Sequence, residues 1–416
     1  MPSATSAHDL PHEIIDMVVD HTKSDTTTLR ALRLVSKSWS LRSRNCLFRE
    51  IVLSTEDRCI TFKSLFEERA SLSCVKALAI RVSTLHNWLN DRPSESILPI
   101  LPLLDSLTHF SIFGGCENLS WMEMSPSVKI AFYEVMERPY VTSITLSCIT
   151  DFDILPLTQY LHLEELILDT LTLSVDTSVE FSACFPLKSP SSPAHRSYLR
   201  RLVVTASPRP LMALLTTCSK RSQETGTLDL SNLTHLKVST PYQADEVESA
   251  DWASFFDICA ASIESYTVYQ RTVQVPFPPE IIPLHQFLNL KKFLLTIDYH
   301  ASTRDGHNSF PTFVEALDRF SRAGNETSMT NIRVEYEGCG RYFEKEIDTL
   351  MDGQWLRRFD EVIQRPAFSK LKEVVFGFGP YCCRVAEGWS ETFDRIRSQL
   401  SSLDRRGILS TLTKSL

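Results

Sequence analysis

The spacing of apolar residues between positions 10 and 48 predicts three short amphipathic helices. The first begins at Leu10-Pro11, since proline suits the first helical turn, and its apolar face comprises Ile14, Ile15, Val18 and Val19. The second follows Asp25, a favourable capping residue, and carries the stripe Leu29, Leu32, Val35 and Trp39. The third spans roughly residues 41–48. About 40 residues bury too little surface to be stable alone, so these helices either pack on the rest of the chain or present apolar stripes to a partner.

From about residue 70 onward a different pattern recurs, in which apolar residues occupy the first, fourth and sixth positions of a six-residue stretch. The fourth positions are Leu78, Phe110, Ile144, Leu166, Leu202, Leu236, Tyr266, Phe293, Ile332 and Val374. Such alternation predicts strands with one buried face, and the copies follow one another at intervals of 22 to 42 residues. Helical or apolar stretches separate many of them, at residues 128–137, 211–220, 252–261, 313–322 and 355–364.

Strands and helices that repeat in this order predict an α/β fold with a parallel sheet, arranged as an irregular solenoid that resembles leucine-rich repeats. The alternative is an ordinary α/β domain in which parallel strands alternate with helices. The predicted organisation is a helical unit at residues 8–53, repeats at 70–380 and a C-terminal helical cap at 381–416. Three stretches interrupt the pattern and are expected to be surface loops or connectors: Pro186–Ser197, Val275–Pro283 and Ala301–Pro311.

The sequence motifs of the helical unit resemble those of a known family. Its motifs are Leu10-Pro11-x-Glu13-Ile14, Leu29-Arg30-Ala31, Leu34-Val35-Ser36-Lys37-Ser38-Trp39 and Leu47-Phe48. Over residues 8–53 it resembles an F-box, in the form found in the F-box proteins abundant in mushroom-type fungi. The resemblance implies docking onto a Skp-type adaptor, which joins a cullin scaffold and a RING subunit of a ubiquitin ligase. It also implies that this chain selects a protein substrate and performs no chemistry, and that the adaptor contacts are Leu10, Pro11, Glu13, Ile14, Leu29, Val35 and Trp39.

A second hypothesis is that these helices merely cap a repeat scaffold and never meet an adaptor. The exposure of four residues separates the two hypotheses: Leu10, Pro11, Ile14 and Val35. If they are exposed, a partner is needed to cover them. If they are buried against residues 60–110, the capping hypothesis is favoured.

The positions between the core residues of the predicted strands are expected to line the exposed face of the sheet. They mix charges of both signs with an aromatic residue, which suits a protein partner, although any solenoid also needs polar residues there to stay in solution. We expect the substrate contacts among Glu165, Asp169, Arg201, Lys237, Tyr269, Asp298 and Arg333.

Charge and cysteine usage narrow the classes of partner and compartment. The net charge of −8 disfavours general nucleic-acid binding. One basic stretch, residues 30–49, contains Arg30, Arg33, Lys37, Arg42, Arg44 and Arg49 and no acid. It is either a solvated helix face or a surface that steers toward an acidic adaptor, and no DNA-binding motif accompanies it. Eleven scattered cysteines without a CxxC pair predict reduced thiols in a cytosolic or nuclear protein, and no apolar run predicts a membrane span or a secretory signal.

Motifs that carry enzyme chemistry are missing from the sequence. It has 12 glycines and no phosphate-binding glycine loop, GxSxG elbow or HExxH pair. His162 has no second metal ligand at helical spacing, and the vicinal pair Cys382-Cys383 is expected to be buried rather than redox-active. We therefore expect no catalysis, no metal and no cofactor; an enzyme with an unrecognised site is the remaining alternative.

Overall fold

The structure is a computed structural model. It describes residues 10–67, 73–82, 88–91, 96–115, 118–154, 156–157, 160, 162–173, 199–205, 228–239, 255–271, 282–299, 310–323, 326–338, 350, 354–379 and 389–413. The chain forms two compact units, Met1–Phe152 and Asp153–Leu416. The predicted loop at 186–197, the predicted helix at 211–220, and Cys382 and Cys383 lie outside the described residues, as do most of the two other predicted loops.

The first unit begins with the three predicted helices, α1 (His12–His21), α2 (Thr26–Leu32) and α3 (Lys37–Leu47). The Asp25 carboxylate caps α2 by accepting from the backbone N–H groups of Thr27 and Thr28, at 3.0 and 3.1 Å. These helices share a small core of their own, made of Ile15, Val19, Leu29 and Trp39 with Leu32, Cys46 and Leu47 packed against it.

The boundary between the second and third helices differs from the prediction. The helix α2 ends at Leu32, so Val35 lies in the turn that follows, and Trp39 belongs to α3. The N–H groups of Leu34 and Val35 bond to carbonyls three residues earlier, and Ser36 is extended at the start of α3. Serine favours the capping position over a helix interior, and a continuous apolar stripe across residues 29–39 concealed that stop.

The rest of the first unit is a parallel sheet. Its strands lie in the order β1 (Glu50–Leu53), β2 (Ala77–Arg81), β3 (His109–Phe113) and β5 (Ser143–Phe152), and β4 (Leu119–Ser120) pairs with β5. The helices among the strands are α4 (Glu56–Glu67), α5 (Trp88–Asp91), η2 (Leu101–Leu103) and α7 (Pro126–Met136). The sheet therefore starts at Glu50, inside the range predicted for the helical unit. The prediction missed β1 because its four residues are too few to carry the repeated pattern.

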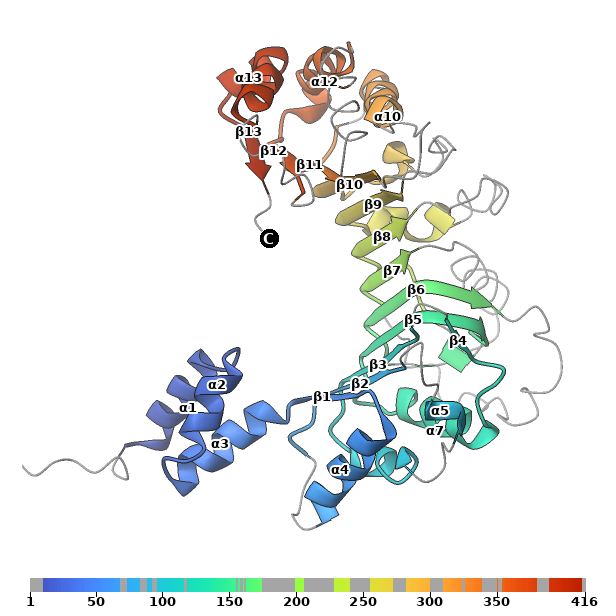
Figure 1. Cartoon of the computed structure of the whole chain (residues 1–416). Coiled ribbons are helices and arrows are strands. Elements are labelled where there is room, and N and C mark those ends of the chain that lie inside the picture. Colours follow the sequence, from blue (N-terminus) through green and yellow to red (C-terminus); the bar gives the residue numbers. More distant parts are fainter. Residues whose placement is uncertain are drawn as a thin grey trace, which may run out of the picture. The chain divides into compact units, whose positions relative to one another are not determined.

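In the second unit, eight strands follow one another in chain order, and each pairs in parallel with the next (Figure 1). They are β6 (Glu165–Leu173), β7 (Arg201–Thr205), β8 (His235–Ser239), β9 (Ser265–Arg271), β10 (Lys292–Tyr299), β11 (Asn331–Gly338), β12 (Glu373–Phe378) and β13 (Leu409–Thr413). The helical elements among them are η5 (Ala260–Ser262), η7 (Leu284–Gln286), α10 (Phe310–Arg322), α12 (Trp355–Ile363), η8 (Pro366–Phe368), α13 (Trp389–Gln399) and α14 (Ser401–Arg405).

The apolar pattern predicted these strands and their register correctly. All ten fourth positions lie in strands, and each is at most 2 % exposed. Within the first unit Leu78 pairs with Phe110, which pairs with Ile144. Within the second unit the pairing runs without a slip from Leu166 to Val374. The α/β class and the parallel arrangement of the strands are thereby confirmed.

The C-terminal segment differs from the predicted helical cap. After α13 and α14, the chain turns at Gly407 and adds β13 to the sheet beside β12. Gly407 has a φ of +66°, a left-handed conformation that glycine adopts without steric cost. The buried carboxylate of Asp360 in α12 accepts from the backbone N–H groups of Ser402 and Leu403, at 3.2 and 3.1 Å, and so holds the start of α14.

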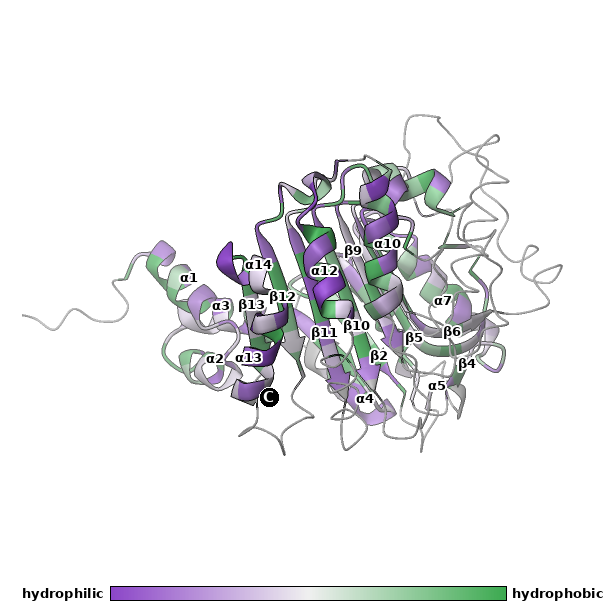
Figure 2. Ribbon diagram, turned by 90° about the horizontal axis from the view of Figure 1, so that it is seen from above, coloured by the Kyte–Doolittle hydropathy of each residue, from purple (hydrophilic) through white to green (hydrophobic). Residues whose placement is uncertain are grey.

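The helices α10 and α12 each bury one face, and Figure 2 shows hydrophobic and hydrophilic stretches on both. Phe313 of α10 stacks on Phe293 of β10 with ring centroids 4.7 Å apart, and Phe310 packs against Phe359 of α12. These contacts place the helices on the face of the sheet that carries the fourth pattern positions.

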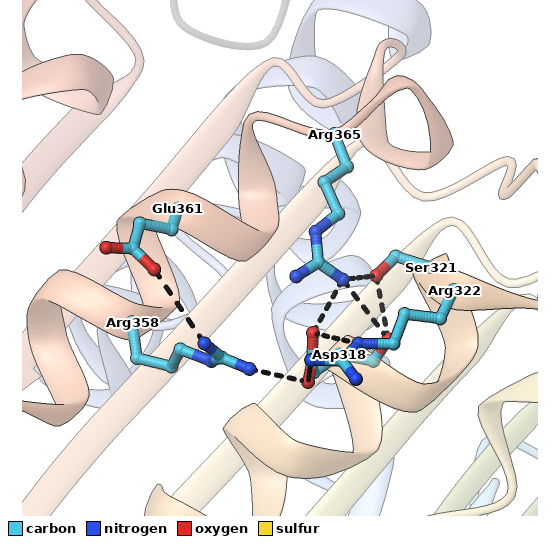
Figure 3. A network of polar contacts seen from close by, with 6 residues as sticks. All are labelled: Asp318, Ser321, Arg322, Arg358, Glu361 and Arg365. Atoms are coloured by element: carbon cyan, nitrogen blue, oxygen red, sulfur yellow. Dashed lines mark hydrogen bonds and ion pairs between the residues drawn. The ribbon is translucent and has the colours of Figure 1, made fainter.

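A polar cluster joins α10 to α12 at the helix surface (Figure 3). Arg322, Arg358 and Arg365 pair with the Asp318 carboxylate at 2.9, 2.9 and 2.6 Å. Burial alone would raise the pKa of Asp318, but hydrogen bonds from Arg358 and Arg365 outweigh it and hold that pKa below its ordinary value. The cluster fastens the two helices together through a carboxylate that stays ionised.

Candidate functional site

The three-helix part of the first unit exposes a set of large apolar side chains. They are between 37 % and 87 % exposed and comprise Leu10, Ile14, Met17, Val18, Leu34, Val35 and Leu41. Pro11 and Glu13 are exposed as well. The core of these helices uses other residues, so the exposed set does not serve the packing of α1, α2 and α3.

Two residues predicted to contact an adaptor are instead buried. Leu29 and Trp39 are only 1 % and 6 % exposed and form the core of the three helices. They hold the helices together and offer little surface to a partner, because their apolar stripe faces inward. Sequence reasoning missed Leu34, the most exposed residue of the set. The available signal was its place beside Val35, two residues before Ser36 at the N-cap position of α3.

Cations flank the exposed pair Leu34 and Val35 in the sequence. Arg30, Arg33 and Lys37 are exposed on either side of it. Arg42, by contrast, is compensated, since its guanidinium pairs with Asp16 and Asp20 at 3.2 and 3.0 Å. An apolar centre with a basic rim suits a partner whose groove is apolar and whose border is acidic.

A second candidate surface lies on the sheet of the second unit, on the face away from α10 and α12. The seven predicted substrate contacts alternate with the buried pattern positions along their strands and are matched by the register. The structure therefore brings them onto one face: Glu165 and Asp169 on β6, Arg201 on β7, Lys237 on β8, Tyr269 on β9, Asp298 on β10 and Arg333 on β11.

Several of these side chains contact one another across strands. Arg201 pairs with Glu165 at 2.9 Å. The Tyr269 hydroxyl donates to the Asp298 carboxylate at 2.7 Å, and the Lys237 ammonium lies 5.4 Å from the centre of the Tyr269 ring.

Two further contacts continue this arrangement. The Thr205 hydroxyl donates to Asp169, and Arg333 pairs with Glu335 on the same strand. Apolar residues that the prediction did not include lie between the polar ones on this face: Ile167 and Leu294 are half-exposed, whereas Val203 and Val375 are buried. Polar and apolar groups thus alternate across the face, as they do in many protein-binding surfaces.

The described residues hold no group of three His, Cys, Asp or Glu side chains arranged to bind a metal ion. Burial raises the pKa of the Cys59 thiol to about 12 and raises that of Cys259 further. Both are poor nucleophiles at neutral pH, because attack requires the thiolate. Among the helices described, none combines the length and apolar character that a bilayer crossing requires.

A half-open cavity of about 320 Å³ lies between η7 and α10 in the second unit. Its walls are mainly apolar, with Leu284, Ala316 and Phe320 among them, and Arg319 and His285 line it as well. No acid and no nucleophile is among the described residues that line it.

Comparison of the sequence with models of known protein families finds no match, and comparison with curated proteins finds none either. The interpretation of these surfaces therefore rests on their own chemistry.

Proposed function

We propose that this chain is the substrate-recognition subunit of a ubiquitin ligase of the Skp–cullin–F-box kind. The helices α1, α2 and α3 act as an F-box that docks a Skp-type adaptor, and through it the cullin and RING subunits. The sheet face of the second unit, part of an irregular leucine-rich-repeat-like solenoid, holds a protein substrate.

One observation carries this proposal: the helices have a complete core of their own and still expose large apolar side chains. Large apolar groups exposed to water favour association, and a partner that covers them removes the cost of their exposure. The capping hypothesis requires Leu10, Pro11, Ile14 and Val35 to be buried against residues 60–110. All four are exposed, which favours the adaptor.

The chemistry of ubiquitin transfer belongs to the conjugating enzyme in this proposal. The chain contributes proximity, because it holds a substrate lysine at high effective concentration near the charged ubiquitin. It acts in the cytosol or nucleus, where its cysteines stay reduced.

Reconstituted ubiquitin transfer tests the proposal. With adaptor, cullin, RING subunit and conjugating enzyme, the chain should become ubiquitylated or should raise ubiquitin transfer to a bound protein. Alone with ubiquitin and the conjugating enzyme it should support none.

A truncated chain that begins at Arg49 should be inactive in the complete mixture. The truncation removes α1, α2 and α3 and keeps β1, which starts at Glu50. Transfer that is equally fast with this truncated chain would contradict the proposal.

A further inference from the structure

The sheet face of the second unit separates charge along its strands. The register rows near the starts of the strands carry Arg201, His235, Lys237, Lys292 and Arg333. We call these five residues the basic strip. The rows nearer the strand ends carry mainly acids, namely Asp169, Asp298, Glu335 and Glu337, although Arg271 pairs in register with Asp298 in the last row.

The cations of the basic strip are open to a partner. Arg201, His235 and Lys292 are exposed, and Lys237 and Arg333 are half-exposed. Of the acids in the rows nearer the strand ends, Asp169, Asp298 and Glu337 are half-exposed and Glu335 is buried, at 6 % exposed. The exposed members of this charged set are therefore Arg201, His235 and Lys292, which all belong to the strip.

The charge of the strip is only partly compensated. Arg201 pairs with Glu165, and Arg333 pairs with Glu335. Among the described residues, no carboxylate pairs with Lys237 or Lys292. The nearest acid at the β12 side, Glu373, accepts a hydrogen bond from Asn331 at 2.6 Å. The residues one position before the strands add cations and acids together: Arg200 and Lys372 are exposed, but so is Glu164, and Glu264 pairs with Lys291. The excess of positive charge therefore rests on the strip itself.

This local excess opposes the charge of the whole chain, which is −8. A basic surface on an acidic protein attracts acidic partners and discriminates against basic ones. Ile167 and Leu294 are half-exposed and lie in the same register row as Lys237 and Arg333, where they can contact apolar side chains of the same partner. The five strands from β7 to β11 span about 19 Å, which an extended peptide covers with about six residues.

A protein segment fits this surface better than a nucleic acid. Asp169 and Asp298 lie on the same strands as the strip or beside it, and their carboxylates repel a continuous phosphate backbone. The Lys237 ammonium also lies over one face of the Tyr269 ring, so that face is not free to stack on a base.

We propose that the basic strip binds an extended, acidic segment of a partner protein, with carboxylates set against Lys237, Lys292 and Arg333 and apolar residues between them. This inference deepens the proposed function, because it names the chemistry of the substrate that the sheet face would select.

Fluorescence anisotropy of a fluorescein-labelled ten-residue peptide, built from Glu and Asp with two Leu residues, tests this with the full-length chain. The acidic peptide should bind at low ionic strength and weaken as salt rises. The same peptide with Lys in place of every acid should not bind. The charge-reversed double variant Lys237→Glu, Lys292→Glu should weaken binding by about tenfold or more.

A matched double variant on the helical side of the same unit, Arg319→Glu and Lys370→Glu, changes the net charge by the same amount. It should bind the peptide within about twofold of the parent, because the substituted residues lie away from the strip. Lys237→Gln, Lys292→Gln provides a milder change, with a smaller loss in the same direction. Thermal unfolding of each variant serves as the control: an unchanged melting temperature would show that weaker peptide binding is not caused by misfolding.

Absence of binding by the parent, or equal losses in the two charge-reversed variants, would overturn the inference. Tighter binding of a ten-residue uridine RNA that depends on the same lysines would overturn it as well. Adaptor affinity measured on the same samples separates the two proposals: adaptor binding without peptide binding refutes only the basic strip, and peptide binding without adaptor binding refutes only the ligase function.

Discussion

Replacing Leu166 with alanine tests the repeated core most sharply. Leu166 is fully buried on β6, and its register partner Leu202 is buried as well. Alanine removes three carbon atoms, worth about 2.4 kcal/mol at about 0.8 kcal/mol per buried carbon. Incomplete collapse of the resulting cavity adds to that figure, so we expect a loss of about 3–4 kcal/mol in the free energy of unfolding, within the usual range for such sites.

Leu288→Ala is the matched control, since Leu288 lies in the same unit and is 68 % exposed. Its unfolding free energy should change by less than about 0.5 kcal/mol. Urea unfolding followed by circular dichroism measures both variants. Because repeats contact mainly their neighbours, Leu166→Ala should leave adaptor binding by the helical unit unchanged. Equal stabilities for the two variants would refute the placement of Leu166 in a continuous core.

Three further predictions concern individual contacts. Asp318→Asn should destabilise the second unit by about 1.5–3 kcal/mol. Because the pKa of Asp318 is lowered in the folded state, that difference from the parent should be full above about pH 4 and should shrink as pH falls through the folded pKa. Urea titrations that give the same difference at pH 3 and pH 7 would contradict this prediction. Asp360→Ala leaves the N–H groups of Ser402 and Leu403 uncapped, so amide exchange in β13 should accelerate by about tenfold or more, while amides of β6 stay protected. Leu29→Ala should lower the stability of the helical unit by about 2–5 kcal/mol, whereas Leu34→Ala should leave it unchanged; the reverse order would show that the core and the surface have been exchanged.

The sequence predicted the strands of the repeats well, because each copy of the pattern buries its fourth and sixth residues on one face of the strand and so specifies register as well as existence. It did not reveal β1, β4 or β13. The strand β4 has two residues, β1 has four, and β13 places Thr411 where the pattern requires an apolar side chain. Pairing with a neighbouring strand and the αL turn at Gly407 decide these elements, and both depend on tertiary structure.

The candidate surfaces were predictable to different degrees. Alternation along the strands placed all seven polar residues of the sheet face correctly, because side chains two residues apart in a strand share a face. The helical unit was harder to interpret. An apolar stripe does not distinguish residues that face the core, such as Leu29 and Trp39, from those that face solvent, such as Leu34, until the crossing of the three helices is known. The charge pattern of the sheet face was not predicted, because it depends on which side chains stay exposed and which pair with an acid, and sequence spacing shows neither.

The affinity of the purified chain for a Skp-type adaptor tests the central claim most directly. Isothermal titration should give one adaptor per chain for the parent. The double variant Leu10→Ala, Pro11→Ala should bind at least about a hundredfold more weakly, because truncating central anchors of an interface costs about 2–4 kcal/mol each. Both residues are exposed, so the melting temperature should hardly move. An affinity equal in variant and parent, or no adaptor binding by the parent, would contradict the account.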